Sequence, residues 1–241
     1  MNWKRFIGKC TAGIYIIRTK AQPSFSQAGE DQIVRYLFNI LGITKPGYLD
    51  IGTNHPVIGN NSYYFYLRGS KGVCVEPDPG YYSLIKKHRG RDIVLQTGIG
   101  SNSQVTEALL YIFPHPYSGW NTFSEEEAIS RQNESGIGFR EVQKVPLQTI
   151  NSVIEKHFNT YPNFISIDVE GMDLAILRSL DFNRFRPEVI CVETITFSTN
   201  NKEQKVNEIM DFLCGKGYFV YGDTRINTIF CREDAYKGTL S

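Results

Sequence analysis

Carboxylate side chains lie at the ends of short β-branched runs in this sequence, at Asp50, Glu76, Asp168 and Glu193, and Glu170 closely follows Asp168. Such runs are typical of parallel strands that are covered on both faces. In an open parallel sheet, ligands bind beyond the carboxyl ends of the strands. We therefore expect these acids at one edge of a sheet, where they could bind a ribose, hold a divalent cation or assist proton transfer.

Asp50 and Glu76 are 26 residues apart, an interval typical of an acid that accepts both ribose hydroxyls in nucleotide-binding α/β proteins. Gly52, just after Asp50, allows the backbone to approach a ligand without a Cβ atom. The loop lacks the further glycines of the GxGxxG pattern, so a pyrophosphate has no cradle there. The pattern favours S-adenosylmethionine, which has a ribose and no phosphate, over NAD.

The elements that position these acids alternate between strand and helix. Strands are expected over residues 47–51, 72–76, 92–97, 164–169 and 188–193, and an antiparallel pair at one edge over 218–222 and 227–231. Helix starts are indicated by Asp78 before Pro79, by Ser124 with Glu127, and by Thr149 or Asn151, and a further helix is expected over 201–214. This order predicts a doubly wound, mostly parallel α/β sheet with an antiparallel edge strand.

Five segments occur in the order and spacing of one known family. They are residues 26–32 (SQAGEDQ), 48–54 (YLDIGTN), 72–79 (GVCVEPDP), 167–174 (IDVEGMDL) and 187–194 (PEVICVET). Through them the chain resembles the FkbM-family methyltransferases over roughly residues 24–232. The resemblance implies a Rossmann-like, seven-stranded class I methyltransferase fold. It also implies S-adenosylmethionine as donor and O-methylation, commonly of a sugar hydroxyl in a glycan or natural product.

The resemblance also assigns residues to the cofactor. The loop after Asn54 is longer here than in many members, so Asn61 or Ser62 at the following helix start is expected to contact the methionine carboxylate. The expected cofactor-binding residues are Gln27, Asp50, Gly52, Asn54, Ser62, Glu76, Pro77 and Asp168.

A sugar hydroxyl is a poor nucleophile at neutral pH, so a base or a metal ion that lowers its pKa is expected. Asp168 and Glu193 end neighbouring strands and could hold Mg²⁺ or Mn²⁺ through oxygen ligands. His55 and His115 are the alternative bases. Asp168, Glu193, His55 and His115 are thus the predicted catalytic residues, and Asp168 with Glu193 the predicted metal ligands.

The segment 114–138 is predicted to be an insertion that recognises the acceptor and covers the cofactor, because its aromatic residues Tyr117, Trp120 and Phe123 could stack on a sugar ring. The alternative is that these aromatics fill a small satellite core. Arg131, within the same segment, is expected to be a surface charge.

The length of the chain suits one large domain, which the resemblance implies is a methyltransferase domain over residues 24–241. A basic amphipathic segment over 1–23 is expected to precede it and to pack on the domain or on a second subunit, or to lie at a membrane interface. The formal charge of +1 argues against nucleic acid as a partner. The longest uncharged stretch near the amino end is too short for a transmembrane helix. Five cysteines without a CxxC pair indicate reduced thiols and a cytoplasmic protein, with a homo-oligomer as one expected state.

These observations support an S-adenosylmethionine-dependent O-methyltransferase that acts on a carbohydrate hydroxyl of a surface polysaccharide, a nucleotide sugar or a glycosylated natural product. Two alternatives remain open. One is a methyltransferase that acts on a non-sugar hydroxyl or on nitrogen, and the other is a non-catalytic module that binds a nucleotide or a glycan.

Overall fold

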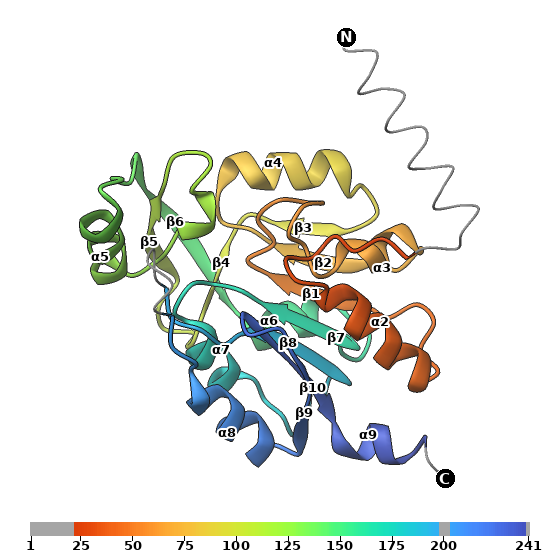
Figure 1. The fold of residues 1–241 in the computed structure, drawn as a ribbon. Coiled ribbons are helices and arrows are strands. Elements are labelled where there is room, and N and C mark those ends of the chain that lie inside the picture. Colours follow the sequence, from red (N-terminus) through yellow and green to blue (C-terminus); the bar gives the residue numbers. More distant parts are fainter. Residues whose placement is uncertain (1–21, 198–202, 240–241) are drawn as a thin grey trace, which may run out of the picture.

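The central sheet forms from the short apolar runs that the sequence places between helices. The computed structural model describes residues 22–197 and 203–239, so nearly all of the expected amphipathic segment 1–23 lies outside the described residues. Seven strands follow the order β3-β2-β1-β7-β8-β10-β9 (Figure 1). They are β1 (Tyr48–Ile51), β2 (Gly72–Val75), β3 (Ile93–Leu95), β7 (Phe164–Ile167), β8 (Val189–Glu193), β9 (Tyr218–Asp223) and β10 (Asn227–Arg232).

The first five of these strands are mutually parallel, and β10 and β9 form the expected antiparallel pair at one edge. Within that pair β10 is the inner strand and runs antiparallel to both of its neighbours, β8 and β9. The predicted fold, a doubly wound and mostly parallel seven-stranded sheet, is confirmed.

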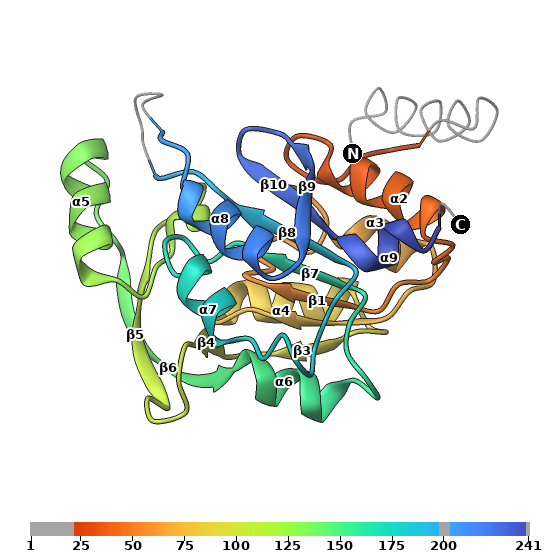
Figure 2. The same cartoon turned by 90° about the horizontal axis from the view of Figure 1, so that it is seen from below.

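Helices cover both faces of the sheet (Figure 1 and Figure 2), and the alternation of side chains along each strand divides the core in two. Leu49 and Ile51 of β1 point to one core, and Tyr48 points to the other. The first core is completed by α6 (Ile150–His157), α7 (Asp173–Ser179) and α8 (Asn207–Gly215), and the second by α2 (Glu30–Ile40) and α3 (Tyr63–Leu67).

Side-chain caps fix three helix starts as the sequence predicts. The Ser124 hydroxyl caps α5 (Glu125–Ser135) by accepting from the N–H of Glu127. The Asp78 carboxylate accepts hydrogen bonds from the backbone N–H groups of Gly80 and Tyr81 at the start of α4 (Pro79–His88). The Thr149 hydroxyl caps α6 by accepting from the N–H of Ser152.

The expected helix over 201–214 is shorter than predicted, because α8 begins at Asn207. Before it, the N–H of Thr196 donates to the carbonyl of Gln204, and the N–H of Val206 donates to the carbonyl of Thr194. These bonds hold the residues just before α8 beside the chain that leaves β8, in an extended arrangement that a helix would break. The final helix, α9 (Glu233–Lys237), follows β10 directly.

A second, three-stranded sheet was not predicted. It has the order β4-β6-β5 and consists of β4 (Gly98–Gly100), β5 (Glu107–Ile112) and β6 (Glu141–Thr149). The connection between β5 and β6 carries the short 3-10 helix η1 (Ser118–Trp120) and the helix α5 (Glu125–Ser135), which projects from the domain (Figure 2). The predicted insertion is therefore mounted on this small sheet. No helix in the described part of the chain is long and apolar enough to cross a membrane.

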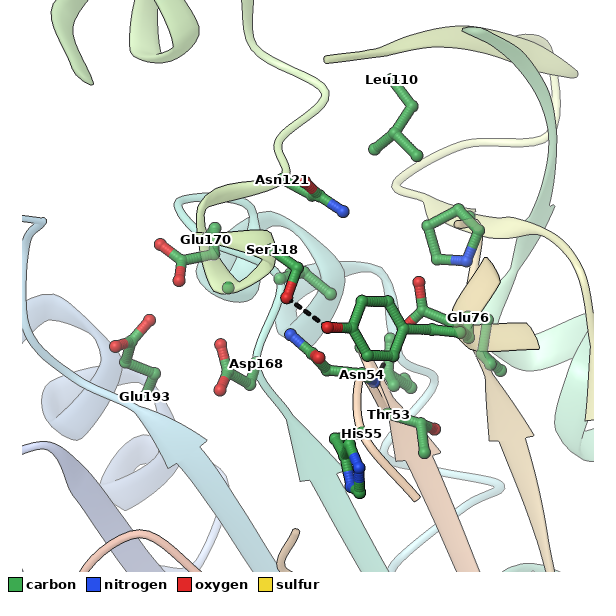
Figure 3. Close-up of a pocket in the computed structure, with 18 of the residues that line it drawn as sticks. Thr53, Asn54, His55, Glu76, Leu110, Ser118, Asn121, Asp168, Glu170 and Glu193 are labelled. Carbon is green, nitrogen blue, oxygen red and sulfur yellow. Dashed lines mark hydrogen bonds between the residues drawn. The ribbon is translucent and has the colours of Figure 1, made fainter. Parts of the chain in front are cut away.

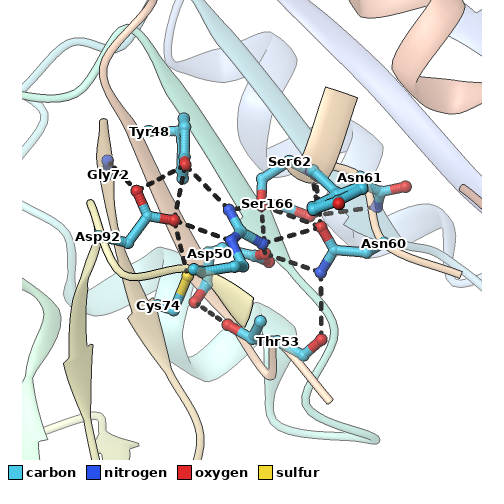
Figure 4. Close-up of polar contacts among 12 residues, drawn as sticks. Tyr48, Asp50, Thr53, Asn60, Asn61, Ser62, Gly72, Cys74, Asp92 and Ser166 are labelled. Atoms are coloured by element: carbon cyan, nitrogen blue, oxygen red, sulfur yellow. Dashed lines mark hydrogen bonds and ion pairs between the residues drawn. The ribbon is translucent and has the colours of Figure 1, made fainter. Parts of the chain in front are cut away.

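A fully buried arginine, Arg89, contacts several of the polar residues that Figure 4 labels, among them Tyr48, Asp50 and Asp92. Its guanidinium donates to Asp92 at 2.8 Å and to the hydroxyl of Tyr48 at 2.9 Å, and it lies 3.7 Å from Asp50. It also donates to Ser62 at 2.8 Å. Two buried carboxylates therefore depend on one buried cation.

We predict that Arg89→Met lowers the free energy of unfolding by about 3–5 kcal/mol, because the substitution leaves two uncompensated acids in the interior. Urea titration followed by far-UV circular dichroism measures the loss. Arg184→Met is the matched control, since Arg184 forms an exposed ion pair with Glu155 and such pairs contribute about 1 kcal/mol or less. Equal losses in the two variants would contradict the prediction.

Candidate active site

A cavity of about 360 Å³, which we call the main cavity, opens at the carboxyl ends of β1, β2, β7 and β8. Its walls come from the loops that follow these strands, from the second sheet and from the insertion (Figure 3). The lining residues are 27, 51–55, 58–59, 75–77, 81, 97–99, 110, 116, 118–119, 121, 123, 168–170, 172 and 193. Its size suits a small-molecule ligand.

The structure brings most of the predicted site residues together in this cavity. All but one of them lie at or just after the carboxyl end of a central strand, and the exception lies in the segment just before α2. Those that line the main cavity are Gln27, Gly52, Asn54, His55, Glu76, Pro77, Asp168 and Glu193.

Asp50 and Ser62 are placed elsewhere. Asp50 lies on the same side of β1 as Tyr48, away from Ile51, and the Ser62 hydroxyl donates to its carboxylate at 2.6 Å. Both belong to the Arg89 network behind the loop (Figure 4). Asn61 is also turned inward, since its side chain donates to Ser166.

Glu76 joins the loop after β1 to the loop after β2. One carboxylate oxygen accepts from the N–H of Asn54 at 2.7 Å, and the other accepts from the N–H of Asp78 at 2.8 Å. Burial raises the pKa of Glu76 to about 8 despite these bonds. Each oxygen keeps acceptor capacity, so the carboxylate can still receive hydroxyl donors from the cavity.

Gly52 permits the closest backbone approach in the site. Its φ is +77°, and a Cβ atom added there would lie 1.8 Å from the carbonyl oxygen of Asp168. Only glycine allows the loop after β1 to pass so close to the end of β7.

Three carboxylates gather at one end of the main cavity, on Asp168, Glu170 and Glu193, with one oxygen of each within 4.8 Å of the others. The pKa of each of the three carboxyl groups is raised, mainly by burial and secondly by repulsion from the neighbouring carboxylates. Oxygen ligands at this spacing fit a divalent cation, which would offset the repulsion. The predicted convergence of Asp168 and Glu193 is thus present, and Glu170 joins them.

Arg131 is not the surface charge that the sequence suggested, because its side chain is only 1% exposed. It forms ion pairs with Glu170 at 3.0 Å and with Glu127 at 3.1 Å, and it donates to the carbonyl of Trp120 at 2.7 Å. The Glu127 carboxylate therefore pairs with Arg131, four residues further along α5, and the N–H of Ser124 donates to the hydroxyl of Thr122 instead. Of the expected capping box, the bond from the N–H of Glu127 to the Ser124 hydroxyl forms, and the return bond to the Glu127 side chain does not. The ion pair between Arg131 and Glu170 thus links the insertion to the acidic end of the main cavity.

The backbone around His55 holds its ring in the tautomer that donates a hydrogen bond from Nε2. Its Nδ1 accepts from the N–H groups of Val57 at 3.1 Å and Ile58 at 3.0 Å, so the proton of the neutral ring lies on Nε2. Burial, followed by the nearby His88, lowers its pKa and favours this neutral form. With Nδ1 engaged, the ring has no free lone pair with which to act as a base.

His115 does not line the main cavity. It is exposed and lies in a second cavity of about 380 Å³, which we call the side cavity, together with Arg140.

The insertion supplies part of the wall, as predicted, but only one of its three predicted aromatic residues takes part. Tyr117 and Trp120 pack on Phe113 in a satellite cluster, whereas Phe123 lines the main cavity. Ser118 of the insertion shares a 2.6 Å hydrogen bond with Tyr81 of α4, and both line the main cavity (Figure 3).

Sequence reasoning missed Tyr81 and Ser118. The place of Tyr81 in the first turn after the Asp78 cap was a usable signal, since that turn follows Glu76, the acid that the sequence predicts to bind the ribose. Nothing local in the sequence marks Ser118.

Comparison with known proteins gives one family match: a model described as the methyltransferase FkbM domain matches residues 50–220. No curated protein matches the chain.

Three solved structures illustrate the distant likeness of the chain. A TehB-like SAM-dependent methyltransferase from Corynebacterium glutamicum is 10% identical, with a TM-score of 0.44 and coverage of 93% of this chain and 97% of that one. An O-methyltransferase from Bacillus cereus in complex with SAH is 11% identical, with a TM-score of 0.44 and coverage of 90% and 86%. The 1,6-didemethyltoxoflavin-N1-methyltransferase from Burkholderia thailandensis, with bound S-adenosylhomocysteine, is 9% identical, with a TM-score of 0.41 and coverage of 95% and 84%.

We predict that Gly52→Ala costs at least about 3 kcal/mol of unfolding free energy, because the new methyl group collides with the backbone of Asp168. Gly59→Ala is the control. Gly59 also has a positive φ, of +67°, but nothing lies within 4 Å of its Cβ position, so we expect a cost of about 1–2 kcal/mol. Urea unfolding of both variants separates the collision from the backbone strain, and similar losses would show that the close approach is unimportant.

Proposed function

Because the chain belongs to the FkbM family of methyltransferases, we propose that its main cavity binds S-adenosylmethionine and that the protein transfers the methyl group to a carbohydrate hydroxyl. The observation that carries the proposal is the position of Glu76. This acid directly follows β2, lines the cavity, and accepts a hydrogen bond from the N–H of Asn54 in the glycine-containing loop after β1. That is the arrangement in which a carboxylate accepts both hydroxyls of a ribose.

The two ends of the main cavity differ in chemistry, which supports an orientation for the cofactor. Leu110 and Phe123 pack together and, with Ile99, also line the cavity, where they could enclose an adenine ring. Figure 3 shows Leu110 on the opposite side of the cavity from Glu193. The carboxylates of Asp168 and Glu193 lie at the other end (Figure 3). With the ribose at Glu76, the sulfonium and its methyl group would lie toward the acids, where their negative charge favours a cation.

We further propose that the acceptor hydroxyl is activated at the acidic end. Asp168 and Glu193, with Glu170, would hold Mg²⁺ or Mn²⁺, and such an ion lowers the pKa of a hydroxyl bound to it. If no ion binds, Asp168 is better suited than His55 to take the proton, because its pKa is raised and the lone pair of His55 is engaged.

The carbohydrate acceptor, a role in polysaccharide biosynthesis and a cytoplasmic location are parts of the same proposal. The family resemblance supports the acceptor class, and the insertion over 114–138 is proposed to cover the acceptor as well as the cofactor. Transfer of a labelled methyl group from S-adenosylmethionine to sugar nucleotides or to oligosaccharides tests the activity. Transfer only to non-sugar alcohols or amines would favour a different acceptor class, and binding without transfer would favour a binding module.

We predict that, at a pH above its raised pKa of about 8, Glu76→Ala weakens the binding of S-adenosylmethionine by about 1.5–3 kcal/mol, the usual contribution of a hydrogen bond to a charged group. Calorimetry measures the loss, and Glu107→Ala serves as control because Glu107 is an exposed acid that pairs with Lys144 on the second sheet. Unchanged affinity in a folded Glu76→Ala protein would remove Glu76 from the ribose site. Tight binding of NAD by the wild type would contradict the cofactor assignment.

We predict that EDTA abolishes methyl transfer, that Mg²⁺ or Mn²⁺ restores it, and that Asp168→Asn loses turnover by at least about a hundredfold while it still binds S-adenosylmethionine. The reason is that the neutral amide is a weaker ligand for a hard cation and cannot accept a proton. Asp211→Asn, at an exposed position on α8, is the control. Full activity of the wild type in EDTA would exclude the ion and leave the carboxylate of Asp168 as the proposed base.

A further inference from the structure

We infer that the side cavity binds an oxyanion of the acceptor, a phosphate or a carboxylate group, while the acceptor hydroxyl lies in the main cavity. This inference rests on the proposed function and deepens it, since it assigns an acidic carbohydrate as the acceptor. The side cavity has a volume of about 380 Å³ and lies between the start of α4 and the insertion. No part of the proposed methyl transfer uses it.

The two cavities adjoin, because His55, Tyr81 and Ser118 line both of them. An acceptor that reaches these three residues can therefore contact the main cavity and the side cavity at once. The hydrogen bond between Tyr81 and Ser118 lies at this junction (Figure 3).

The polar groups that the side cavity offers are mainly donors. Arg140 is exposed, and no carboxylate among residues 22–197 and 203–239 forms an ion pair with it. His55 presents Nε2–H, because its Nδ1 already accepts two backbone N–H groups. His115 lines the same cavity as Arg140. The hydroxyls of Tyr81 and Ser118 share one hydrogen bond, so one of the two keeps its proton free to donate. A guanidinium, two imidazoles and a hydroxyl are groups that bind phosphate or carboxylate oxygens.

One acid, Asp78, also lines the side cavity, but its charge is already engaged. It is only 2% exposed. One carboxylate oxygen accepts from the N–H groups of Gly80 and Tyr81, and the other accepts from the side chain of Asn121. The positive end of α4 further offsets its charge. The side cavity therefore presents the guanidinium of Arg140 together with polar donors, in contrast to the carboxylates at the acidic end of the main cavity.

The test uses the full chain and two probes, inorganic phosphate and glucuronate, which represent the two sources of an oxyanion. The chain has four histidines, and their ring C–H signals can be followed by NMR during each titration. We expect saturable shifts at His55 and His115 and none at His157, which lies at the end of α6. Binding of phosphate assigns a phosphorylated acceptor, and binding of glucuronate assigns a sugar acid.

Arg140→Gln should weaken the binding of the effective probe about tenfold, whereas Arg140→Lys should retain most of it, because the charge remains. Lys144→Gln is the matched control, since it removes an exposed cation from β6 outside both cavities. Once an acceptor is known, Arg140→Gln should raise its KM with little change in kcat.

Two results would overturn the inference. One is equal probe affinity in the wild type and Arg140→Gln, and the other is displacement of the probe by S-adenosylmethionine, which would place the anion in the main cavity. Saturable probe binding that depends on Arg140 in a protein that does not bind S-adenosylmethionine would contradict the proposed function and leave the anion site supported.

Discussion

The site depends on one buried cation. The guanidinium of Arg89 joins the end of α4 to Tyr48 and Asp50 in β1 and to Asp92 at the start of β3. Asn60 then extends this network to the site, because its side chain accepts from Arg89 and donates to the carbonyl of Thr53 in the main cavity wall. Charged groups are costly to bury unless they are paired. The loop that we assign to the cofactor is therefore positioned from behind, by charges that do not face the ligand.

The sequence predicted what depends on local pattern. The five parallel strands, the edge pair and the caps Asp78 and Thr149 followed from short apolar runs and from residues with a known preference for helix starts. The direction of Asp50 could not be predicted in the same way. A strand buried on both faces has apolar residues throughout, so its sequence does not show which face each side chain joins. Glu76 lies beyond the end of its strand and escapes this ambiguity.

Other features depend on contacts between distant segments, which local patterns do not report. The sequence around Arg131 is that of a charged surface helix, yet the Arg131 side chain is buried. Its burial is possible because the guanidinium pairs with Glu170 and donates to the carbonyl of Trp120. The second sheet was missed for a related reason. β4 is a three-residue strand with two glycines, and it becomes recognisable as a strand only through its pairing with β6.

The distribution of charge around the two cavities constrains how an acceptor can bind. Without a bound ion, Asp168, Glu170 and Glu193 would repel an anionic group at one end of the main cavity, whereas the guanidinium of Arg140 in the side cavity would attract it. An acidic sugar therefore has one favourable orientation, with its oxyanion in the side cavity and a neutral hydroxyl toward the carboxylates. Since the attraction and the repulsion act together, the same arrangement would select the hydroxyl that is methylated.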